Sequence, residues 1–259
     1  MHVSAVAEAK GIAFSEGEFL VKTLEGEAEL TQAYRLRHKV FAEALRWVPP
    51  TNDGQEMDMY DLWGTSIGLF DSRGTLHGMA RLLPATGLFM LEQDLRMLLP
   101  SDHILRKERD TAEVTRLAID PDIKDKGLSA RLLLTLVKGI YHWAQAQDVR
   151  FLYIEVDYRF FRVLNAMAIA CDPLGPPVAL PPAGTLSIAA IMDIVRCEQV
   201  LGRKRPQVME WMSTVTATRG NIGKRTIAEC IEPEPRRSVL PGVPVHAERK
   251  NSTIELVSQ

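Results

Sequence analysis

The sequence carries little net charge for a chain of 259 residues. Its 31 lysines and arginines are opposed by 33 aspartates and glutamates, which gives a formal net charge of -2 at pH 7. Proteins that bind DNA or RNA usually carry a basic surplus, so the composition argues against a nucleic-acid partner. Proline and glycine, at 15 and 17 residues, are not enriched, which excludes collagen-like and low-complexity chains. Hydrophobic residues make up 46% of the chain, as in an ordinary globular protein.

Segments that would place the chain in a membrane are missing as well. The first residues lack the basic start and the long apolar run of a secretory signal. No apolar window is long enough to span a bilayer. We therefore expect a cytoplasmic protein that does not insert into membranes.

The patterns of metal and nucleophile chemistry are also absent. The three cysteines, Cys171, Cys197 and Cys230, show no Cys-x-x-Cys spacing, and the six histidines form no His-Glu-x-x-His motif. A disulfide framework and a four-ligand zinc site are therefore not expected. No Gly-x-Ser-x-Gly motif occurs and no cysteine has an evident base nearby in sequence, so covalent catalysis has no support. We expect neither a metal nor a cofactor.

Hydrophobic periodicity predicts strands that alternate with helices. Residues 185–195 fit both states, because their β-branched residues favour a strand and their three-residue spacing favours a helix; we predict a strand. The other strands are expected at 19–22, 65–70, 76–83, 113–119 and 151–156, and the helices at 26–43, 88–100, 129–147, 160–169 and 201–218.

This order predicts a mixed α/β (α+β) sandwich, in which helices flank one central sheet. The domain is expected at residues 19–218, between a flexible arm at 1–18 and a flexible tail at 219–259. Residues 45–63, with two prolines, Asn-Asp-Gly and several carboxylates, form a long loop, and such loops are more often functional than idle. Residues 173–182 form a proline-rich connection.

A basic, glycine-containing turn precedes the helix at 129–147. Lys124 and Gly127 lie in it, where free N–H groups and the positive end of a helix dipole could receive a phosphate. The turn lacks the Walker spacing but fits the looser basic-x-x-Gly-x-small turn that holds the coenzyme A pyrophosphate in acetyltransferase-like folds. An ordinary strand-to-helix turn is an equally good interpretation.

Charged side chains also interrupt the predicted strands. Arg81, Glu113 and Arg116 lie in otherwise apolar runs, where an unpaired charge is costly, and Asp58 and Asp61 in the preceding loop are possible partners. Glu113 and Arg116 are three residues apart, so on a regular strand they face opposite sides and share a site only if a bulge or bend intervenes. A structural ion pair or an edge-strand charge is the common alternative.

An arginine and two aromatic residues occur together at the end of the first helix. Arg37, Phe41 and Trp47 could hold a flat or cationic ligand by stacking and cation–π contact. Simple core packing is the alternative for each aromatic residue alone.

These residues occur in one order: Arg37-x-x-x-Phe41, Trp47, Asp58-x-x-Asp61, Arg81-Leu-Leu-Pro, Met-Leu at 90–91, then Glu113-x-x-Arg116. The ordered set resembles the acyl-homoserine lactone synthases, the LuxI-type autoinducer synthases, over roughly residues 19–195. The resemblance implies a GNAT-like (acetyltransferase-like) fold and a quorum-sensing signal as product. The amine of S-adenosylmethionine would attack an acyl thioester on acyl carrier protein or coenzyme A, and lactone closure would then release methylthioadenosine.

The resemblance also implies roles for individual residues. Arg37, Phe41 and Trp47 would form the adenosylmethionine side of the pocket. The charged cluster that orders the N-terminal loop over it would consist of Asp58, Asp61, Arg81, Glu113 and Arg116.

Chemical reasoning adds two expectations to these roles. Only the free amine attacks, so a carboxylate should take its proton; we expect Glu113, with Asp58 or Asp61 as competitors. The acyl chain needs an apolar slot. The residues expected to line it are Leu117, Phe151, Ile154, Val156, Phe160 and Leu164.

The sequence departs from the family pattern in two places. An aromatic residue typical of the stretch after Met90 is absent, so either Phe89 substitutes for it or the pocket differs. Ile154 aligns with a threonine or serine linked to 3-oxo chains, which argues against a 3-oxo acyl group.

Other interpretations remain for function and partner. A related N-acyltransferase would make an N-acyl amino acid without lactone closure, and a non-catalytic relative would only bind its ligand. An acidic carrier protein would dock on a basic patch, although a solvated helix face explains the same charges. The residues of that patch are Lys124, Lys126, Arg131, Lys138 and Arg150.

Overall fold

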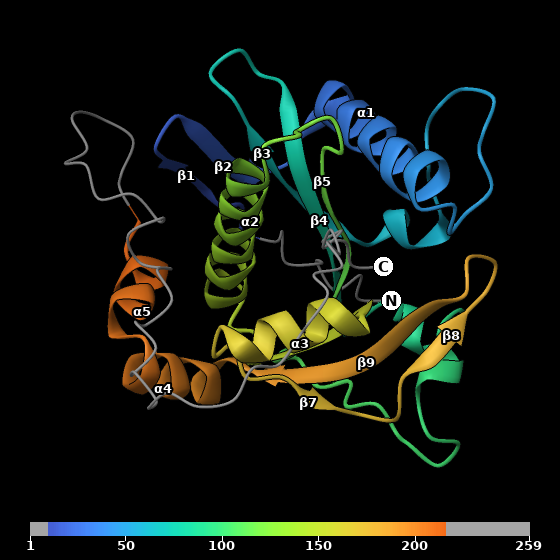
Figure 1. Ribbon diagram of the computed structural model, residues 1–259, viewed down its shortest axis with the longest axis vertical. Helices are drawn as coiled ribbons and strands as arrows, with labels where there is room; N and C mark the ends of the chain where they lie inside the picture. The colour runs from blue at the N-terminus through green and yellow to red at the C-terminus, as the bar shows by residue number, and fades with distance from the viewer. Residues whose placement is uncertain (1–9, 216–259) are drawn as a thin grey trace, which may run out of the picture.

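A computed structural model describes residues 10–215, and one mixed sheet organises them (Figure 1). Eight strands follow one another in the order β1-β2-β3-β4-β5-β6-β9-β7, and β8 pairs with β9 beside them. All neighbours are antiparallel except β5 and β6. The strands are β1 (Ala13–Glu16), β2 (Phe19–Thr23), β3 (Thr65–Phe70), β4 (Leu76–Pro84), β5 (Thr111–Ile119), β6 (Phe151–Asp157), β7 (Asp172–Pro173), β8 (Val178–Leu180) and β9 (Thr185–Asp193).

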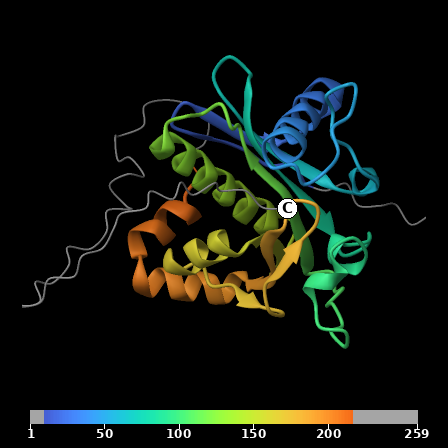
Figure 2. The same cartoon turned by 45° about the vertical axis from the view of Figure 1, so that its right-hand side comes forward.

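Helices cover both faces of this sheet (Figures 1 and 2). The helices α2 and α3 share the larger hydrophobic core with one face, and α1 packs a separate core against the other. No helix within residues 10–215 is long and apolar enough to cross a bilayer. The helices are α1 (Gly26–Arg37), α2 (Lys126–Ala146), α3 (Tyr158–Ala166), α4 (Ile194–Lys204) and α5 (Pro206–Ser213).

The first helix does not stop at the end of α1. Residues His38–Ala44 continue it as a π-helical turn, in which the N–H of Leu45 donates to the carbonyl of Val40. This wider turn carries Phe41, and the N–H of Trp47 then donates to the Phe41 carbonyl at 2.8 Å. The chain therefore leaves the helix with both aromatic residues on the same side of the sheet.

The parallel pair β5–β6 opens partway along its length. Pairing runs from Thr111 opposite Phe151 to Val114 opposite Ile154, although β5 continues to Ile119 and β6 to Asp157. Beyond this point β5 pairs only with β4, and β6 only with β9. The two strands therefore splay apart in the middle of the sheet.

A β-bulge in β5 sets the direction of the charged side chains. The register between β4 and β5 shifts between Met79 opposite Ala118 and Arg81 opposite Thr115, so β5 has one extra residue there. Arg116 lies in the bulge with φ of 53°, in the left-handed region. The bulge turns Arg116 to the α1 side of the sheet, where Glu113 also lies. The sequence predicted that these two residues could share a site only if such a bulge or bend intervened.

The predicted mixed sheet with flanking helices is confirmed, and so is the strand at 185–195. Three expectations about elements were wrong. The arm at 1–18 is not wholly irregular, because Gly17 (φ of 61°) forms a turn that pairs β1 with β2. The helix expected at 88–100 is two 3-10 turns, Met90–Glu92 and Arg96–Leu98, since a carboxylate from β5 takes the N–H groups of Met90 and Leu91.

The third difference lies after the last long strand. The helix α4 begins at Ile194, earlier than the helix expected at 201–218, because the Asp193 side chain caps it by accepting from the Val195 N–H. The connection at 173–182 contains the short strands β7 and β8. The tail expected at 219–259 lies outside the described residues.

Replacing Gly139 by alanine should destabilise the protein. Gly139 lies where α2 crosses the sheet, and a Cβ there would lie 2.7 Å from Val21 Cγ1 and 3.2 Å from Ile67 Cδ1. We expect the free energy of unfolding to fall by about 1–3 kcal/mol, as overpacking typically costs. The control is Gly202→Ala in α4, where no atom lies within 4 Å of the added Cβ. Helix propensity alone should stabilise that variant by up to about 1 kcal/mol. Urea unfolding measures both values, and equal stabilisation by both changes would contradict the packing of α2 on the sheet.

Candidate active site

The loop at 45–63 ends in a short capped turn. Met59–Leu62 forms one 3-10 turn, and the Asp58 side chain accepts from the Tyr60 N–H at 2.9 Å. The Asp61 side chain accepts in return from the Asp58 N–H at 2.8 Å. This capping box fixes both aspartates with their outer oxygens toward the sheet.

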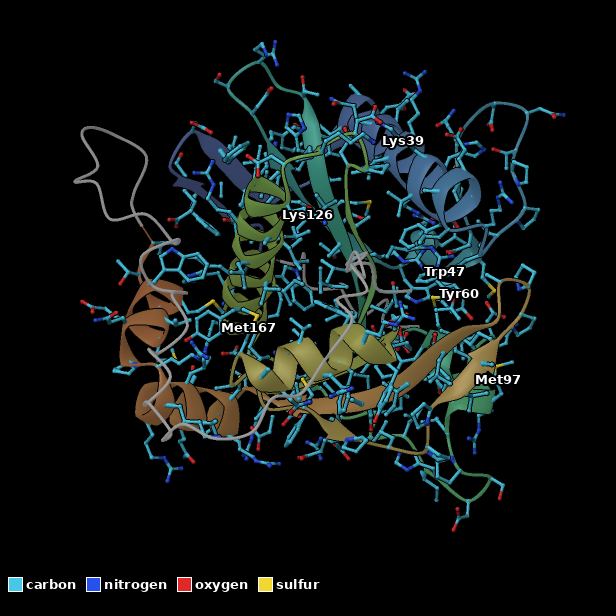
Figure 3. All side chains as sticks on the ribbon, viewed as in Figure 1. Lys39, Trp47, Tyr60, Met97, Lys126 and Met167 are labelled. Atoms are coloured by element: carbon cyan, nitrogen blue, oxygen red, sulfur yellow. The ribbon has the colours of Figure 1, made fainter. Side chains whose placement is uncertain are left out.

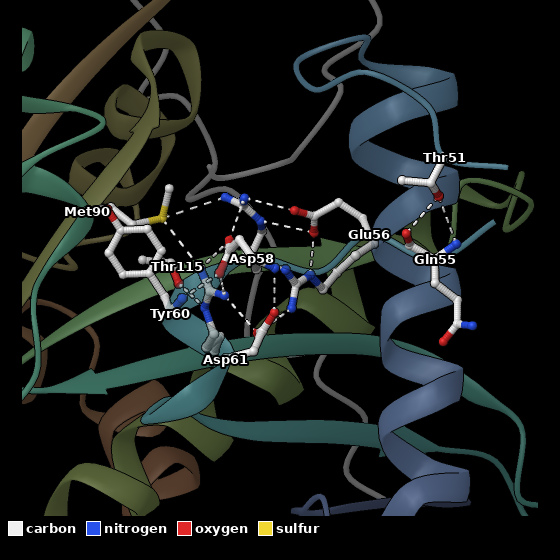
Figure 4. A network of polar contacts seen from close by, with 11 residues as sticks. Thr51, Gln55, Glu56, Asp58, Tyr60, Asp61, Met90 and Thr115 are labelled. Carbon is white, nitrogen blue, oxygen red and sulfur yellow. Dashed lines mark hydrogen bonds and ion pairs between the residues drawn. The ribbon is translucent and has the colours of Figure 1, made fainter. Parts of the chain in front are cut away.

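Three arginines meet three loop carboxylates under this turn (Figure 4). The guanidinium of Arg81 reaches Asp58 at 2.5 and 3.0 Å and Asp61 at 2.7 Å. Arg37 pairs with Asp61 at 2.6 Å, and Arg116 pairs with Asp58 at 2.9 Å. A further carboxylate, Glu56, accepts from Arg37 Nε and from Arg116 Nη2, the latter at 2.9 Å. The ion network consists of Arg37, Arg81, Arg116, Glu56, Asp58 and Asp61.

Burial makes the ion network strongly coupled. The side chains of Arg37 and Arg81 are 0% exposed, and Glu56 is 5% exposed. Burial alone would raise the pKa of Glu56, but the guanidiniums of Arg116 and Arg37 outweigh it and hold the pKa at about 2. Burial would lower the pKa of Arg37, and its carboxylate partners raise that pKa instead. Three arginines therefore face three carboxylates in this network, and their formal charges cancel.

A cavity of about 220 Å³ adjoins the ion network on the α1 side. Phe41 and Trp47 stack there with ring centroids 6.0 Å apart, and the Arg116 guanidinium lies over the Phe41 ring at 5.4 Å. The Trp47 indole N–H donates to Thr185 Oγ1 at 2.8 Å, which ties the loop to β9. Figure 3 shows Trp47, Tyr60 and Met97 on this side of the molecule, whereas Lys126 lies on α2. The α1-side cavity is lined by Phe41, Trp47, Val48, Met90, Asp94, Leu95, Met97, Arg116, Leu180 and Pro181.

Of the residues expected in that pocket, Arg37 lies behind the cavity wall rather than in it. It holds Glu56 and Asp61, so it supports the wall through the ion network. Phe89 does not substitute for the missing aromatic residue, because it is fully buried against Tyr153, at a centroid distance of 5.9 Å. Leu95 lines the cavity instead.

Glu113 lies in the wall between the cavity and the sheet. Its side chain has no exposed surface, and its oxygens accept from the N–H groups of Met90 at 2.6 Å and Leu91 at 2.9 Å. Met90 lines the cavity and its sulfur faces Arg81 and Arg116. Glu113 therefore fixes a wall residue and does not itself line the cavity.

Glu155 of β6 is a second buried carboxyl beside Glu113. It is 0% exposed, and neither of its oxygens has a hydrogen-bond partner at normal distance among the described residues. Burial and then the negative charge of Glu113 raise the pKa of Glu155 well above its ordinary value. Burial also raises the pKa of Glu113, which the two backbone N–H groups oppose. Of the two carboxyls, Glu155 therefore favours its protonated form more strongly.

A second cavity lies on the α2 side of the splayed strands. Its wall is almost wholly apolar, and it includes the expected residues Leu117, Ile154, Val156, Phe160 and Leu164. Phe151 was wrongly expected there: it lies under the guanidiniums of Arg106 and Arg150. The other lining residues of the α2-side cavity are Val114, Val137, Ile140, Tyr141, Leu152, Ile169, Met192, Ile194, Cys197, Glu198, Leu201, Met209 and Met212.

The turn before α2 differs from the expected phosphate site. The Asp125 side chain accepts from the N–H groups of Gly127 at 2.8 Å and Leu128 at 3.2 Å, so a carboxylate already occupies the helix N-terminus. The Lys124 ammonium donates to the Pro121 carbonyl and its side chain is 82% exposed.

The expected basic patch is smaller than the sequence suggested. Lys138 is buried, and Arg150 forms a bidentate pair with Asp193. Lys124, Lys126 and Arg131 are exposed or partly exposed near the start of α2, and Arg131 pairs with Glu18 at 3.2 Å.

Three further site residues escaped the sequence reasoning. Glu56 lies two residues before Asp58 in the same acidic loop, so the carboxylate count of that loop could have included it. Asp94 is the carboxylate among the residues that line the α1-side cavity, and Glu155 interrupts an apolar strand as Glu113 does. A charge in a buried strand was the available signal for Glu155.

Comparison with known proteins gives consistent matches over this region. A family model described as autoinducer synthase matches residues 22–200. The acyl-homoserine-lactone synthase of Agrobacterium fabrum is 33% identical over 178 residues, which cover 66% of this chain and 82% of that protein. The corresponding synthase of Vibrio anguillarum is 28% identical over 151 residues, 58% of this chain and 78% of that protein.

Solved structures agree with these matches at the level of fold. The AHL synthase LasI matches with a TM-score of 0.61 and 20% identity, over 68% of this chain and 90% of that one. The CoA-dependent acyl-homoserine lactone synthase BjaI, solved with SAM and isopentyl-CoA, matches with a TM-score of 0.60 and 22% identity, over 78% and 90%. The overall fold is therefore shared with these structures.

Changing Glu155 to glutamine should stabilise the protein progressively as the pH rises. The folded protein keeps a proton on Glu155 that the unfolded chain releases above the ordinary value of 4.5. Stability is therefore highest below that pH, and each pH unit above it removes up to about 1.4 kcal/mol until Glu155 ionises in the folded state. Glutamine has the same shape and no proton to lose. Urea unfolding of both proteins from about pH 5 to about pH 8 measures the effect. A stability difference that stays constant over this range would contradict a protonated Glu155.

Proposed function

The chain belongs to the autoinducer synthase family, and we propose the following assignment of its two cavities. The protein is an acyl-homoserine-lactone synthase, an acyltransferase that uses S-adenosylmethionine and an acyl thioester and releases methylthioadenosine. We assign S-adenosylmethionine to the α1-side cavity and the acyl chain to the α2-side cavity. The catalytic unit comprises the central sheet and its helices within residues 10–215.

One observation carries this assignment: the two cavities share a wall at the β5–β6 splay. Arg116 lines the α1-side cavity, and its neighbour Leu117 lines the α2-side cavity. On β6, Ile154 and Val156 line the α2-side cavity while Glu155 between them faces Glu113. A polar substrate and an apolar substrate can therefore approach the same short stretch of strand from opposite faces.

The chemistry of the α1-side cavity fits a sulfonium nucleoside. The stacked rings of Phe41 and Trp47 offer faces to an adenine ring and to a cation. Arg116 supplies a positive charge for the methionyl carboxylate, and Asp94 supplies a negative charge for the sulfonium.

The attacking amine does not require a dedicated carboxylate base. An α-amino group has a pKa of about 7.7–8.0, so roughly a tenth of it is uncharged at pH 7. We therefore assign Glu113 a positioning role, as the anchor of Met90 and Leu91, in place of the proton-accepting role that the sequence suggested. Asp58 and Asp61 accept hydrogen bonds from the Arg81 guanidinium, so we assign them a positioning role as well.

We assign acyl carrier protein as the acyl donor. Asp125 occupies the helix N-terminus where a coenzyme A pyrophosphate would bind, and its negative charge would repel that group. The exposed ammonium groups of Lys124 and Lys126 would instead meet an acidic carrier protein. CoA-dependent relatives such as BjaI exist, so the donor needs a direct test.

The donor assignment predicts a rate difference between two thioesters of one acyl chain. With S-adenosylmethionine, the acyl carrier protein thioester should release methylthioadenosine with a kcat/KM at least about tenfold above that of the coenzyme A thioester, because charge steering speeds encounter. The double change Lys124→Ala and Lys126→Ala should lower the first rate and leave the second unchanged.

Each other outcome of this assay has a definite meaning. A faster coenzyme A reaction would overturn the donor assignment alone. No methylthioadenosine from either donor at any chain length would overturn the proposed function. An open N-acyl amino acid in place of the lactone, identified by mass spectrometry, would assign the related N-acyltransferase reaction.

Glu113→Gln should lower kcat at every pH while the protein stays folded. The glutamine amide presents N–H to one of the backbone N–H groups of Met90 and Leu91, so one hydrogen bond is lost and the cavity wall moves. The wild-type kcat/KM for S-adenosylmethionine should rise with pH through about pH 8 as the amine is freed. The control is Glu108→Gln, an exposed carboxylate before β5, which should match the wild type. If the Glu113→Gln rate reached the wild-type rate at high pH, Glu113 would be the proton acceptor instead.

A further inference from the structure

One wall of the α2-side cavity lies partly outside the region that the family model covers. The helix α4 contributes Cys197, Glu198 and Leu201 to the lining, and α5 contributes Met209 and Met212. The family match ends at residue 200, so Leu201 and all of α5 are additional to it. Figures 1 and 2 show α4 and α5 beside the C-terminal half of α2.

A buried lysine fixes α5 in this place. Lys138 of α2 is 1% exposed, and its ammonium pairs with Glu16 of β1 at 2.7 Å. The same ammonium lies 4.7 Å from the ring centroid of Trp211, and the Trp211 indole N–H donates to Glu16 at 2.9 Å. Glu16 precedes the matched region 22–200 and Trp211 follows it. Both residues contact the side chain of Lys138, which lies within that region.

A second polar link holds α4 to the same face of α2. Tyr141, three residues after Lys138, donates its hydroxyl to Glu198 at 2.7 Å, and Gln145 donates to the same carboxylate at 3.0 Å. Residues 138, 141 and 145 follow the helical repeat, so they lie along one stripe of α2. The two links hold α4 and α5 against one stripe of α2 next to the cavity.

The cost of burying Lys138 argues that the position of α5 matters. An ammonium loses most of its hydration at 1% exposure, and a well-packed apolar residue would give comparable or higher stability. The Lys138 ammonium has to contact both the Glu16 carboxylate and the Trp211 ring. The charge therefore fixes the position of Trp211, and with it α5, relative to α2. A cavity wall that stays at a defined distance from the splayed strands β5 and β6 needs helices held in place by such contacts.

We propose that α4 and α5 form the end wall of the acyl cavity and that Leu201, Met209 and Met212 determine the length of the acyl chain that the enzyme accepts. The proposal rests on the proposed function. The first carbons of the chain lie between the splayed strands, where Leu117, Ile154 and Val156 line the cavity. Its methyl end meets the wall, and a chain too long for the cavity has to displace anchored helices.

The experiment measures kcat/KM for a series of straight-chain acyl carrier protein thioesters with the full-length protein and three variants. Met212→Ala removes most of a side chain from the wall and should favour longer chains, whereas Met212→Trp should favour shorter ones. The ratio of rates for two chains that differ by two carbons should change by at least about tenfold, since one methylene in a pocket is worth roughly 10–200-fold. Val208→Ala is the matched control, because Val208 packs in the same helix and does not line the cavity.

The outcomes separate the proposal from the proposed function. Opposite shifts in the two Met212 variants, with an unchanged profile in Val208→Ala, support the end wall. Unchanged profiles in both Met212 variants, with folding checked by circular dichroism, overturn it while the synthase activity stands. No product from the wild type with any chain overturns the proposed function itself. If Met212→Trp does not fold, Met209→Ala replaces it as a second enlarging variant.

The anchor provides an independent test of the same proposal. Glu16→Gln removes the charge that pairs with Lys138 and should loosen α5, so the profile should broaden toward longer chains while the rate with the preferred chain changes little. Gln207→Ala, an exposed change in α5, is the control. A uniform loss of rate at all chain lengths would show that the anchor only stabilises the fold.

Discussion

The pairing of three buried guanidiniums with three loop carboxylates is the constraint on which the α1 side of the molecule depends. Two of the three guanidiniums, those of Arg37 and Arg81, have no exposed surface. A guanidinium buried in this way is tolerated only when it is paired and hydrogen-bonded. The carboxylates all come from residues 56–61, whereas the arginines come from α1, β4 and β5. The loop therefore closes over the sheet as part of folding rather than as a free lid. The same closure places Trp47 against Thr185 and completes the α1-side cavity.

The bulge in β5 depends on this network and in turn makes it possible. A left-handed residue other than glycine costs about 1–2 kcal/mol, and Arg116 adopts that conformation. The bidentate contact of Arg116 with Glu56, at 3.2 and 2.9 Å, offsets the strain. Without the extra residue, Arg116 would point to the α2 side and place a charge in the apolar cavity. The bulge thus separates a polar from an apolar chamber across one strand.

The sequence allowed the strands of the central sheet and the charged cluster to be predicted, because both have local signals. Runs of apolar residues mark β3, β4 and β5, and charges within β4 and β5 mark Arg81, Glu113 and Arg116. The 3-10 turns at 90–98 could not be predicted, since the carboxylate that captures Met90 and Leu91 comes from residue 113. The contacts behind the positioning role that we propose for Glu113 could not be predicted for the same reason: its partners are backbone N–H groups, which carry no sequence signal. The occupation of the α2 N-terminus by Asp125 did have a local signal, as aspartate is a preferred capping residue.

The side chains on the two faces of the sheet differ in how readily they can be substituted. On the α1 side, every member of the ion network contacts at least two others, so the loss of one charged group leaves a net charge in the buried network. On the α2 side, the wall consists mainly of apolar side chains, and volume-conserving apolar substitutions in such a wall cost less than about 1.5 kcal/mol. The region that the family model matches contains the whole ion network but stops before α5. The ion network therefore lies wholly within the matched region, and the apolar wall of the α2-side cavity extends beyond its end into α5.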